Sequence, residues 1–462
     1  MKVTIKNLGV LESAEYELGN LTVVCGKNNT GKTYAAYALY GFLDYWRNGY
    51  DFQVDSVLQD EFQNNGEVLI NEKQVRNFLQ KNLERAYKKY SGERLPEALG
   101  YSSDSFKRQF NDCDFCVEID QKNISPLFDV NLQKRFRGIY NGAKLPIKVD
   151  VDRDNIRISH VYPQTVQKIY FNSMISPFIS REIIPYASFA SADRIGAAMF
   201  SDEIRYLRDE FYQKKESALI KTIPVDYPIP VTKNLNAIRD SLLSPPQLSE
   251  DIQQIFCELL GGKFEITNGK LFFVPLNSAG DLSLSVMASS SSVRSLLSLW
   301  LQLCKETQTL HLPNMFMIDE PEMNLHPASQ RLLARIFARL VNLGYKIYIT
   351  THSDYIVKEL NTLIMLNRRN KNNKDIIEQY GYSEKEFLDP ANVRVYMTQE
   401  SQTKNKNIKK ITTKNNKKFF MPKYKFIQAK IDEFGIDLPS FDETIDEMNK
   451  IQIELLAGDD NE

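Results

Sequence analysis

The stretch LTVVCGKNNTGKTYAAYALYGFLDYWR, residues 21–47, decides the fold of this chain. Its first five residues form an uninterrupted run with strong strand propensity, which predicts a short buried strand. From residue 30 onward the apolar side chains recur at helical spacing, which predicts a helix. A buried strand, a glycine-bearing loop and a helix in this order are typical of α/β proteins with a parallel sheet.

The loop between this strand and this helix fits the pattern GxxxxGK[ST] of a phosphate-binding loop. Its glycines let successive backbone N–H groups turn toward phosphates, and the helix N-terminus adds partial positive charge. Lys32 would reach the β- and γ-phosphates, and the Thr33 hydroxyl would ligate Mg²⁺. The alternative is a chance occurrence in a loop, but the flanking strand and helix favour a phosphate site. The predicted phosphate-binding residues are Gly26, Lys27, Asn28, Asn29, Thr30, Gly31, Lys32 and Thr33.

A second apolar run, MFMI at residues 315–318, ends in the carboxylates Asp319 and Glu320. At the end of a buried strand, Asp319 is placed to hold Mg²⁺, directly or through water. Glu320 could polarise the attacking water as a general base. The alternative is a strand end with two solvated acids, which the phosphate-binding loop makes less favourable. We therefore predict Thr33 and Asp319 as metal ligands and Glu320 as a catalytic residue.

A third run, YITT at residues 348–351, ends in His352. Ligands of parallel sheets sit at the carboxyl edge of the strands. A histidine at this edge would lie beside the γ-phosphate, where it can sense that group and orient the water. The alternative is a structural histidine, and the position at the strand end favours a catalytic role for His352.

The order of these three elements resembles the ATP-binding-cassette (ABC) ATPase head. In that family a signature loop precedes the Asp-Glu strand and reaches across a dimer to the partner's nucleotide. MASSSSVRSLL, residues 287–297, occupies the corresponding position, and the resemblance implies that Ser290 and Ser291 contact phosphate. The family usually has glycine after the signature serine, whereas this chain has another serine, so hydrolysis could be slow. A polar linker is the alternative interpretation of these serines.

Two further segments resemble the branch of the family that contains the SMC-like and OLD-like ATPases, also classified as AAA_15 and AAA_21. One is EMNLHP at residues 322–327, and the other is ADRIG at residues 192–196. In the second segment, Arg194 could contact phosphate or a dimer partner, or form an ordinary ion pair. The glutamine loop of the family has no clear counterpart, and Gln164 and Gln167 are weak candidates.

The resemblance implies an α/β fold: an ABC-ATPase head with a parallel core sheet, an antiparallel β lobe and a mostly helical insertion. The expected head is discontinuous, and the rest of the chain forms insertions and a tail. The expected parts are the head at 1–45, 180–200 and 270–366, a helical insertion plus antiparallel β lobe at 46–179, a helical lid and hairpin at 201–269, and a C-terminal Lys-rich segment with a helical tail at 367–462.

The short C-terminal part suggests that any nuclease is a separate chain. OLD nucleases carry a Toprim nuclease after the ATPase, but only about 110 residues follow His352 here and they show no Toprim constellation. This arrangement resembles the stand-alone ATPase subunits of bacterial anti-phage defence systems, PtuA of Septu and AriA of PARIS. The resemblance implies ATP and Mg²⁺ as cofactors, oligomers of the chain itself, and a Toprim- or HNH-type nuclease partner. A DNA-repair ATPase of the RecF or SMC type, and a scaffold that binds ATP without turnover, are the alternatives.

The bulk composition excludes little but agrees with a cytoplasmic protein. The chain has 58 Lys and Arg against 59 Asp and Glu, so net charge does not indicate a nucleic-acid partner. Five scattered cysteines suggest a reducing compartment, and no stretch is apolar over the ~20 residues of a membrane span. One local feature could bind nucleic acid: Lys404–Lys430 contains ten lysines and no acid, with Phe419, Phe420, Tyr424 and Phe426 between them. A solvated loop is an equally good interpretation.

Overall fold

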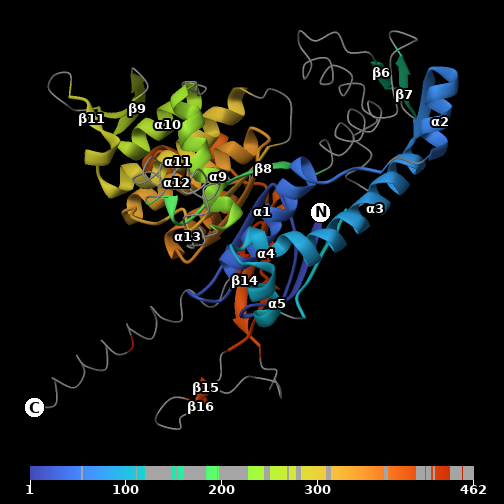
Figure 1. Cartoon of the computed structure of the whole chain (residues 1–462). Coiled ribbons are helices and arrows are strands. Elements are labelled where there is room, and N and C mark those ends of the chain that lie inside the picture. Colours follow the sequence, from blue (N-terminus) through green and yellow to red (C-terminus); the bar gives the residue numbers. More distant parts are fainter. Residues whose placement is uncertain are drawn as a thin grey trace, which may run out of the picture.

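The architecture was obtained as a computed structural model of the whole chain (Figure 1). The residues that the structure describes are 1–53, 56–110, 112–119, 147–151, 155–160, 184–194, 196, 227–243, 250–267, 270–276, 282–308, 314–368, 373–401, 411–412, 418–419, 422–437 and 450. Within the described helices, none combines the length and the apolar character that a membrane crossing requires.

A nine-stranded sheet forms the centre of the molecule. Its strands, in spatial order, are β5 (Asp114–Glu118), β1 (Lys2–Leu8), β2 (Leu11–Glu17), β17 (Tyr424–Gln428), β14 (Val393–Glu400), β3 (Leu21–Cys25), β13 (Lys346–Thr351), β12 (Asn314–Asp319) and β8 (Tyr186–Ala190). From β14 to β8 all neighbours are parallel. The pairs β1–β2, β1–β5 and β14–β17 are antiparallel. The predicted α/β fold with a parallel core sheet is therefore confirmed.

Each face of this sheet packs against a hydrophobic core. Successive residues of a strand point to opposite faces, so alternate side chains enter different cores. In β3, Val24 belongs to one hydrophobic core, whereas Leu21, Val23 and Cys25 belong to a second core. The same alternation runs along β12, where Met315 and Met317 face the first core and Phe316 and Ile318 the second. Strands buried on both sides appear in the sequence as continuous apolar runs.

Helices from different parts of the chain cover the two faces (Figure 1). The first core contains α1 (Lys32–Asn48), α2 (Ser56–Asn65), α3 (Glu72–Lys89), the π-turn Tyr90–Arg94, α4 (Leu95–Ala98) and α5 (Ser103–Gln109). The second contains α10 (Glu250–Leu260), α11 (Ser291–Gln308), α12 (Pro327–Asn342) and α13 (Asp354–Leu366). The helix α9 (Ile229–Leu243) packs against α1, α11 and β8. The structure also describes α14 (Asn373–Tyr380) and three 3₁₀ turns, Val286–Ala288, Glu384–Glu386 and Pro390–Asn392.

The strands within 46–179, where an antiparallel β lobe was expected, do not form one sheet. β5 adds to the edge of the large sheet beside β1. β6 (Ile147–Val151) pairs with β7 (Asn155–His160), and β7 pairs in turn with β4 (Glu67–Asn71). The hairpin of the expected lid and hairpin (201–269) is present as β9 (Gly262–Thr267) and β10 (Lys270–Pro275), and β11 (Leu284–Ser285) pairs with β10. The turn residues Asn268 and Gly269, and residues 201–226 of the expected lid, lie outside the described residues.

The C-terminal part contributes two strands to the central sheet. β14 lies directly beside β3, and β17 joins β14 to β2. The expected head ended at residue 366. With that boundary, two strands of the central sheet, β14 and β17, fall in the expected C-terminal segment. The reason is register: Val393–Met397 pairs along Leu21–Cys25, and the buried side chains Val393 and Val395 extend the second core. The smaller pairs β15 (Ile411–Thr412) with β16 (Lys418–Phe419), and β18 (Lys430–Asp432) with β19 (Gly435–Asp437), complete this part.

Candidate nucleotide-binding site

The phosphate-binding loop leaves the sheet at the end of β3 and leads directly into α1. Gly26 and Gly31 have φ values of 142° and 92°, which L side chains rarely adopt. A Cβ on Gly31 would lie 2.5 Å from Leu11 Cγ, and a Cβ on Gly26 would collide with the hydroxyl of Thr398. Both positions therefore require glycine for conformation and for space. The predicted loop lies where the sequence placed it.

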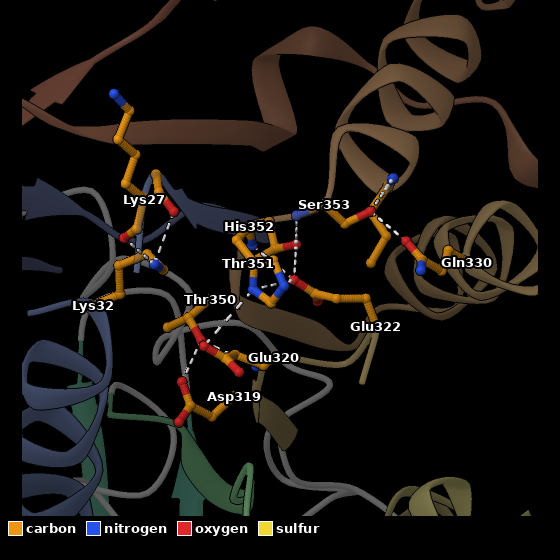
Figure 2. A network of polar contacts seen from close by, with 12 residues as sticks. Lys27, Lys32, Asp319, Glu320, Glu322, Gln330, Thr350, Thr351, His352 and Ser353 are labelled. Carbon is orange, nitrogen blue, oxygen red and sulfur yellow. Dashed lines mark hydrogen bonds and ion pairs between the residues drawn. The ribbon is translucent and has the colours of Figure 1, made fainter. Parts of the chain in front are cut away.

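Lys32 begins α1 and folds back over the loop. Its Nζ donates to the backbone carbonyls of Gly26 at 2.9 Å and Lys27 at 2.8 Å, and the side chain is only 4% exposed (Figure 2). Burial lowers the pKa of Lys32, while the nearby acids, first Glu320 and then Asp319, act in the opposite direction. A buried ammonium beside two carboxylates is suited to bind a phosphate group together with its Mg²⁺ ion, because the ammonium attracts the phosphate and the carboxylates attract the metal ion.

Asp319 ends β12 and meets the start of α1. Thr33 Oγ1 lies 3.2 Å and 3.1 Å from the two carboxylate oxygens of Asp319. Thr350 Oγ1 also donates to this carboxylate (Figure 2). Burial raises the pKa of Asp319 to about 6, although the hydroxyl of Thr350 partly opposes this shift. A buried carboxylate paired with a hydroxyl provides the hard oxygen donors that Mg²⁺ prefers. The pair Thr33 and Asp319 therefore fits the predicted metal ion.

Glu320 stands in an unusual backbone conformation immediately after β12. Its φ is 49°, a left-handed value that costs a non-glycine residue about 1–3 kcal/mol. The backbone N–H donates to the carbonyl of Thr350 at 3.0 Å, which joins the ends of β12 and β13. This turn carries the Glu320 side chain away from the strand, and the carboxylate lines the same pocket as the phosphate-binding loop.

His352 follows β13, whose position between β3 and β12 brings it to the same edge of the sheet. Its Nδ1 lies 3.2 Å from Glu322 Oε1 and 3.8 Å from Glu320 Oε1. The Glu322 oxygen also accepts from the His352 backbone N–H and from Thr351 Oγ1, both at 2.7 Å (Figure 2). Glu322 is 4% exposed, so its carboxylate is a fixed support for the imidazole. Sequence reasoning quoted Glu322 within EMNLHP but assigned it no role.

The loop residues and Glu320 together line an open pocket of about 530 Å³ at the carboxyl edge of the parallel strands. The lining residues are Val10, Asn28, Asn29, Thr30, Gly31, Lys32, Thr33, Tyr34 and Glu320. Val10 was missed because only the fold brings the β1–β2 turn to the loop, whereas Tyr34 directly follows Thr33 in the sequence and was not considered. The structure therefore unites the phosphate-binding loop with Asp319 and Glu320, and places His352 beside Glu320 and Glu322.

The two signature serines lie elsewhere, at the start of α11, and are not among the residues that line this pocket. Both are exposed. Ser290 Oγ accepts from the Val293 backbone N–H at 3.4 Å and lies 2.8 Å from Ser292 Oγ, so Ser290 caps the helix. The stretch is thus an ordered helix start and not a polar linker.

Arg194 is a buried side chain beside the site. It follows β8, is 2% exposed, and donates to the backbone carbonyls of Asp319 at 2.9 Å and Glu320 at 2.8 Å. These bonds of the Arg194 guanidinium go to backbone carbonyls, so they are not the ordinary ion pair that the sequence allowed. Gln164 and Gln167, the weak candidates for a glutamine loop, lie outside the described residues.

Part of the Lys-rich stretch Lys404–Lys430 is a structural strand. Phe426 is 9% exposed and its ring packs against Tyr16 at 5.7 Å, while Tyr424 packs against the same core. Lys423 Nζ donates to the Gly9 carbonyl at 2.6 Å, and Lys425 pairs with Glu12. In β17 these aromatics are therefore committed to the core and do not present faces for base stacking. Residues 402–410, 413–417 and 420–421 lie outside the described residues.

The fold and this site together define a P-loop ATPase. A model of the AAA ATPase domain family, AAA_15, matches residues 1–357, more than half of the 462 residues. The chain therefore belongs to this AAA ATPase family. A search of curated proteins found no match.

Solved structures of SMC heads are similar to this chain at low identity. One is the SMC head bound to the C-terminal winged-helix domain of ScpA, with 11% identity, a TM-score of 0.36, and coverage of 93% of this chain and 98% of that chain. A second is the Smc head with an extended coiled coil bound to the C-terminal domain of ScpA from Pyrococcus furiosus, with 10% identity, a TM-score of 0.34, and coverage of 98% of both chains. A third is the SMC head from Thermotoga maritima, with 10% identity, a TM-score of 0.30, and coverage of 78% of this chain and 90% of that chain.

Proposed function

We propose that this chain binds ATP with Mg²⁺, hydrolyses the γ-phosphate bond, and does so as a dimer or higher oligomer that encloses the nucleotide. One observation carries the proposal: Asp319 and Glu320 meet the phosphate-binding loop, which ends in Thr33, although the two segments lie far apart in the sequence. A structural ion pair would need neither the glycine-dependent loop nor a glutamate held at a left-handed φ. Active sites are where strained backbone of this kind is commonly found.

Each side chain has a distinct chemical task in this proposal. The loop N–H groups and Lys32 bind the phosphates, and Thr33 and Asp319 hold the metal ion. When bound, Mg²⁺ neutralises charge on the phosphate oxygens. Glu320 accepts a proton from the attacking water as general base. Glu322 Oε1 lies 3.2 Å from His352 Nδ1 and thereby positions the imidazole, in the way that carboxylates orient catalytic histidines.

The placement of the serines supports action in trans. Ser290 and Ser291 do not line the pocket of their own chain, yet they are exposed at the N-terminus of an 18-residue helix. Such an end attracts anions through its free N–H groups and its dipole. In the proposed assembly this end binds the nucleotide held by the loop of a second copy.

Phosphate release separates this proposal from an ATP-binding scaffold. The wild type should release phosphate, Glu320→Gln should bind ATP but release it at least about 10²-fold more slowly, and Lys32→Ala should lose ATP binding. Asp60→Asn, which changes an exposed carboxylate on α2, is the control and should behave as wild type. ATP binding without release, in the wild type alone and with its partner, would favour the scaffold. The serine in place of the signature glycine is the feature that favours that alternative.

For the cellular role, we propose a subunit of a bacterial anti-phage defence complex that controls a Toprim- or HNH-type nuclease partner. The resemblance to PtuA and AriA supports this role. Co-purification with the product of the neighbouring gene, followed by mass measurement of the complex, tests it. A nuclease in a complex of defined stoichiometry would support defence. A DNA-dependent ATPase without such a partner would favour the repair alternative of the RecF or SMC type.

A further inference from the structure

Arg194 is a buried cation to which the proposed ATPase mechanism assigns no role. Four hydrogen bonds leave its guanidinium, and in the described part of the chain all four end on backbone carbonyl oxygens. Burial lowers the pKa of Arg194, while Glu322, Asp319 and Glu320 oppose this shift. A fully buried arginine without a hydrogen-bonded carboxylate is costly, so packing alone does not account for it.

The four acceptors belong to three separate segments. Nη1 and Nη2 donate to the consecutive carbonyls of Asp319 at 2.9 Å and Glu320 at 2.8 Å. Nε donates to the carbonyl of Ser295 at 2.8 Å, within the second turn of α11. The fourth bond, from Nη1 to the Ser191 carbonyl at 3.3 Å, anchors the arginine to its own segment after β8. One planar group therefore joins the end of β12 to the helix that begins with the signature serines.

Glu320 is sensitive to this contact because its backbone is held at both ends. Its N–H is bonded to Thr350 and its carbonyl to Arg194, and these bonds keep a φ of 49° that would otherwise relax. Guanidinium donors are fixed in one plane. A shift of the Ser295 carbonyl must therefore either break its bond to Arg194 Nε or rotate the whole guanidinium, which acts as a rigid fork. Turning the fork moves the Glu320 carbonyl, and with it the carboxylate.

We propose that Arg194 is a positioning residue that couples the position of α11 to Glu320, so that hydrolysis in one copy depends on what the signature end of its own α11 has bound. This inference rests on the proposed function, in which Ser290 and Ser291 engage the nucleotide of a second copy. A displacement of about 1 Å at a catalytic group can cost about 10²-fold in rate, so a small movement of α11 is sufficient.

The first test replaces the fork and keeps the charge. Arg194→Lys should lower kcat by about 10–100-fold, because a single ammonium cannot bond the three segments at once. KM and the affinity for a fluorescent ATP analogue should stay within about twofold, since the phosphate-binding loop is untouched. Gln302→Met is the matched control: Gln302 is buried on α11 and bonds the Phe189 carbonyl of β8, but not the end of β12. It should lower the melting temperature and leave kcat within about threefold.

A second pair of variants tests the link from the helix while Arg194 stays intact. Val293→Ala opens a cavity in the first turn of α11, and Leu303→Ala opens one near its far end; both side chains are buried in the second core. We expect Val293→Ala to lower kcat at unchanged KM, and Leu303→Ala to affect mainly thermal stability. Equal kcat in these two variants, or wild-type kcat in Arg194→Lys, would refute the coupling alone. A wild type that binds ATP and releases no phosphate would refute the hydrolase, and the coupling with it.

Discussion

Replacing Asp319 with asparagine should stabilise the nucleotide-free protein while it removes the activity. Asp319 is 1% exposed, and burial raises the pKa of its carboxyl from 3.8 to about 6. The shift is about two pKa units, and each unit corresponds to about 1.4 kcal/mol, so the ionised carboxylate costs the fold about 3 kcal/mol near neutral pH. Asparagine has nearly the same shape and no charge. Its amide can still bond the hydroxyls of Thr33 and Thr350.

The sign of the pH dependence follows from the raised pKa. Below about pH 4 the carboxyl is protonated in both the folded and the unfolded chain, so the wild type and the Asp319→Asn variant should be equally stable. Between pH 4 and pH 6 the unfolded chain ionises first, and the wild type loses stability relative to Asp319→Asn. Above about pH 6 the difference is complete. Stability of the wild type therefore falls relative to the variant as pH rises.

Differential scanning fluorimetry at pH 4 and pH 7.5, without nucleotide, measures the effect. One kcal/mol moves the melting temperature of a domain of 150–250 residues by about 2–4 °C, so a difference of about 3 kcal/mol should raise the melting temperature by about 6–12 °C at pH 7.5. Addition of ATP and Mg²⁺ should then raise the melting temperature of the wild type but not that of Asp319→Asn, because ligands stabilise only through sites that they bind. Asp60→Asn is the exposed control. A variant that is less stable than wild type at pH 7.5, or that is still stabilised by ATP and Mg²⁺, would refute the reasoning.

Three further predictions concern other parts of the site and sheet. Glu322→Gln weakens the support of His352 and should lower kcat about tenfold with little change in KM, as steady-state phosphate release will show; equal kcat would exclude a positioning role. Gly31→Ala forces a Cβ against Leu11 at a φ of 92°. It should weaken ATP binding by roughly tenfold or more in a fluorescence titration. Gly92→Ala, where a Cβ meets open space, is the control and should bind ATP as the wild type does. Phe426→Ala should destabilise the whole head by about 3–5 kcal/mol in urea unfolding; a loss of DNA binding without this destabilisation would contradict the structural role of β17.

The sequence by itself determined the parts of the site that are local. The loop at 26–33 needs glycines, a lysine and a threonine at set spacings, and these requirements are met within eight consecutive residues. The apolar runs before Asp319 and His352 predicted buried strands for the same reason: a strand covered on both faces has no polar positions to alternate with. Parallel order then brings the strand ends to one edge, so the meeting of these residues could be expected.

Only the tertiary structure decided which distant segments support them. Thr398 bonds Thr30 across 368 positions, and β14 occupies the place beside β3 although no feature of its own residues indicates that neighbour. The polar fork of Arg194 is invisible in the sequence because its acceptors are backbone carbonyls, which every residue possesses. Strand order and backbone acceptors depend on where whole elements pack, and packing is set by the free energy of the entire core rather than by any short stretch of residues.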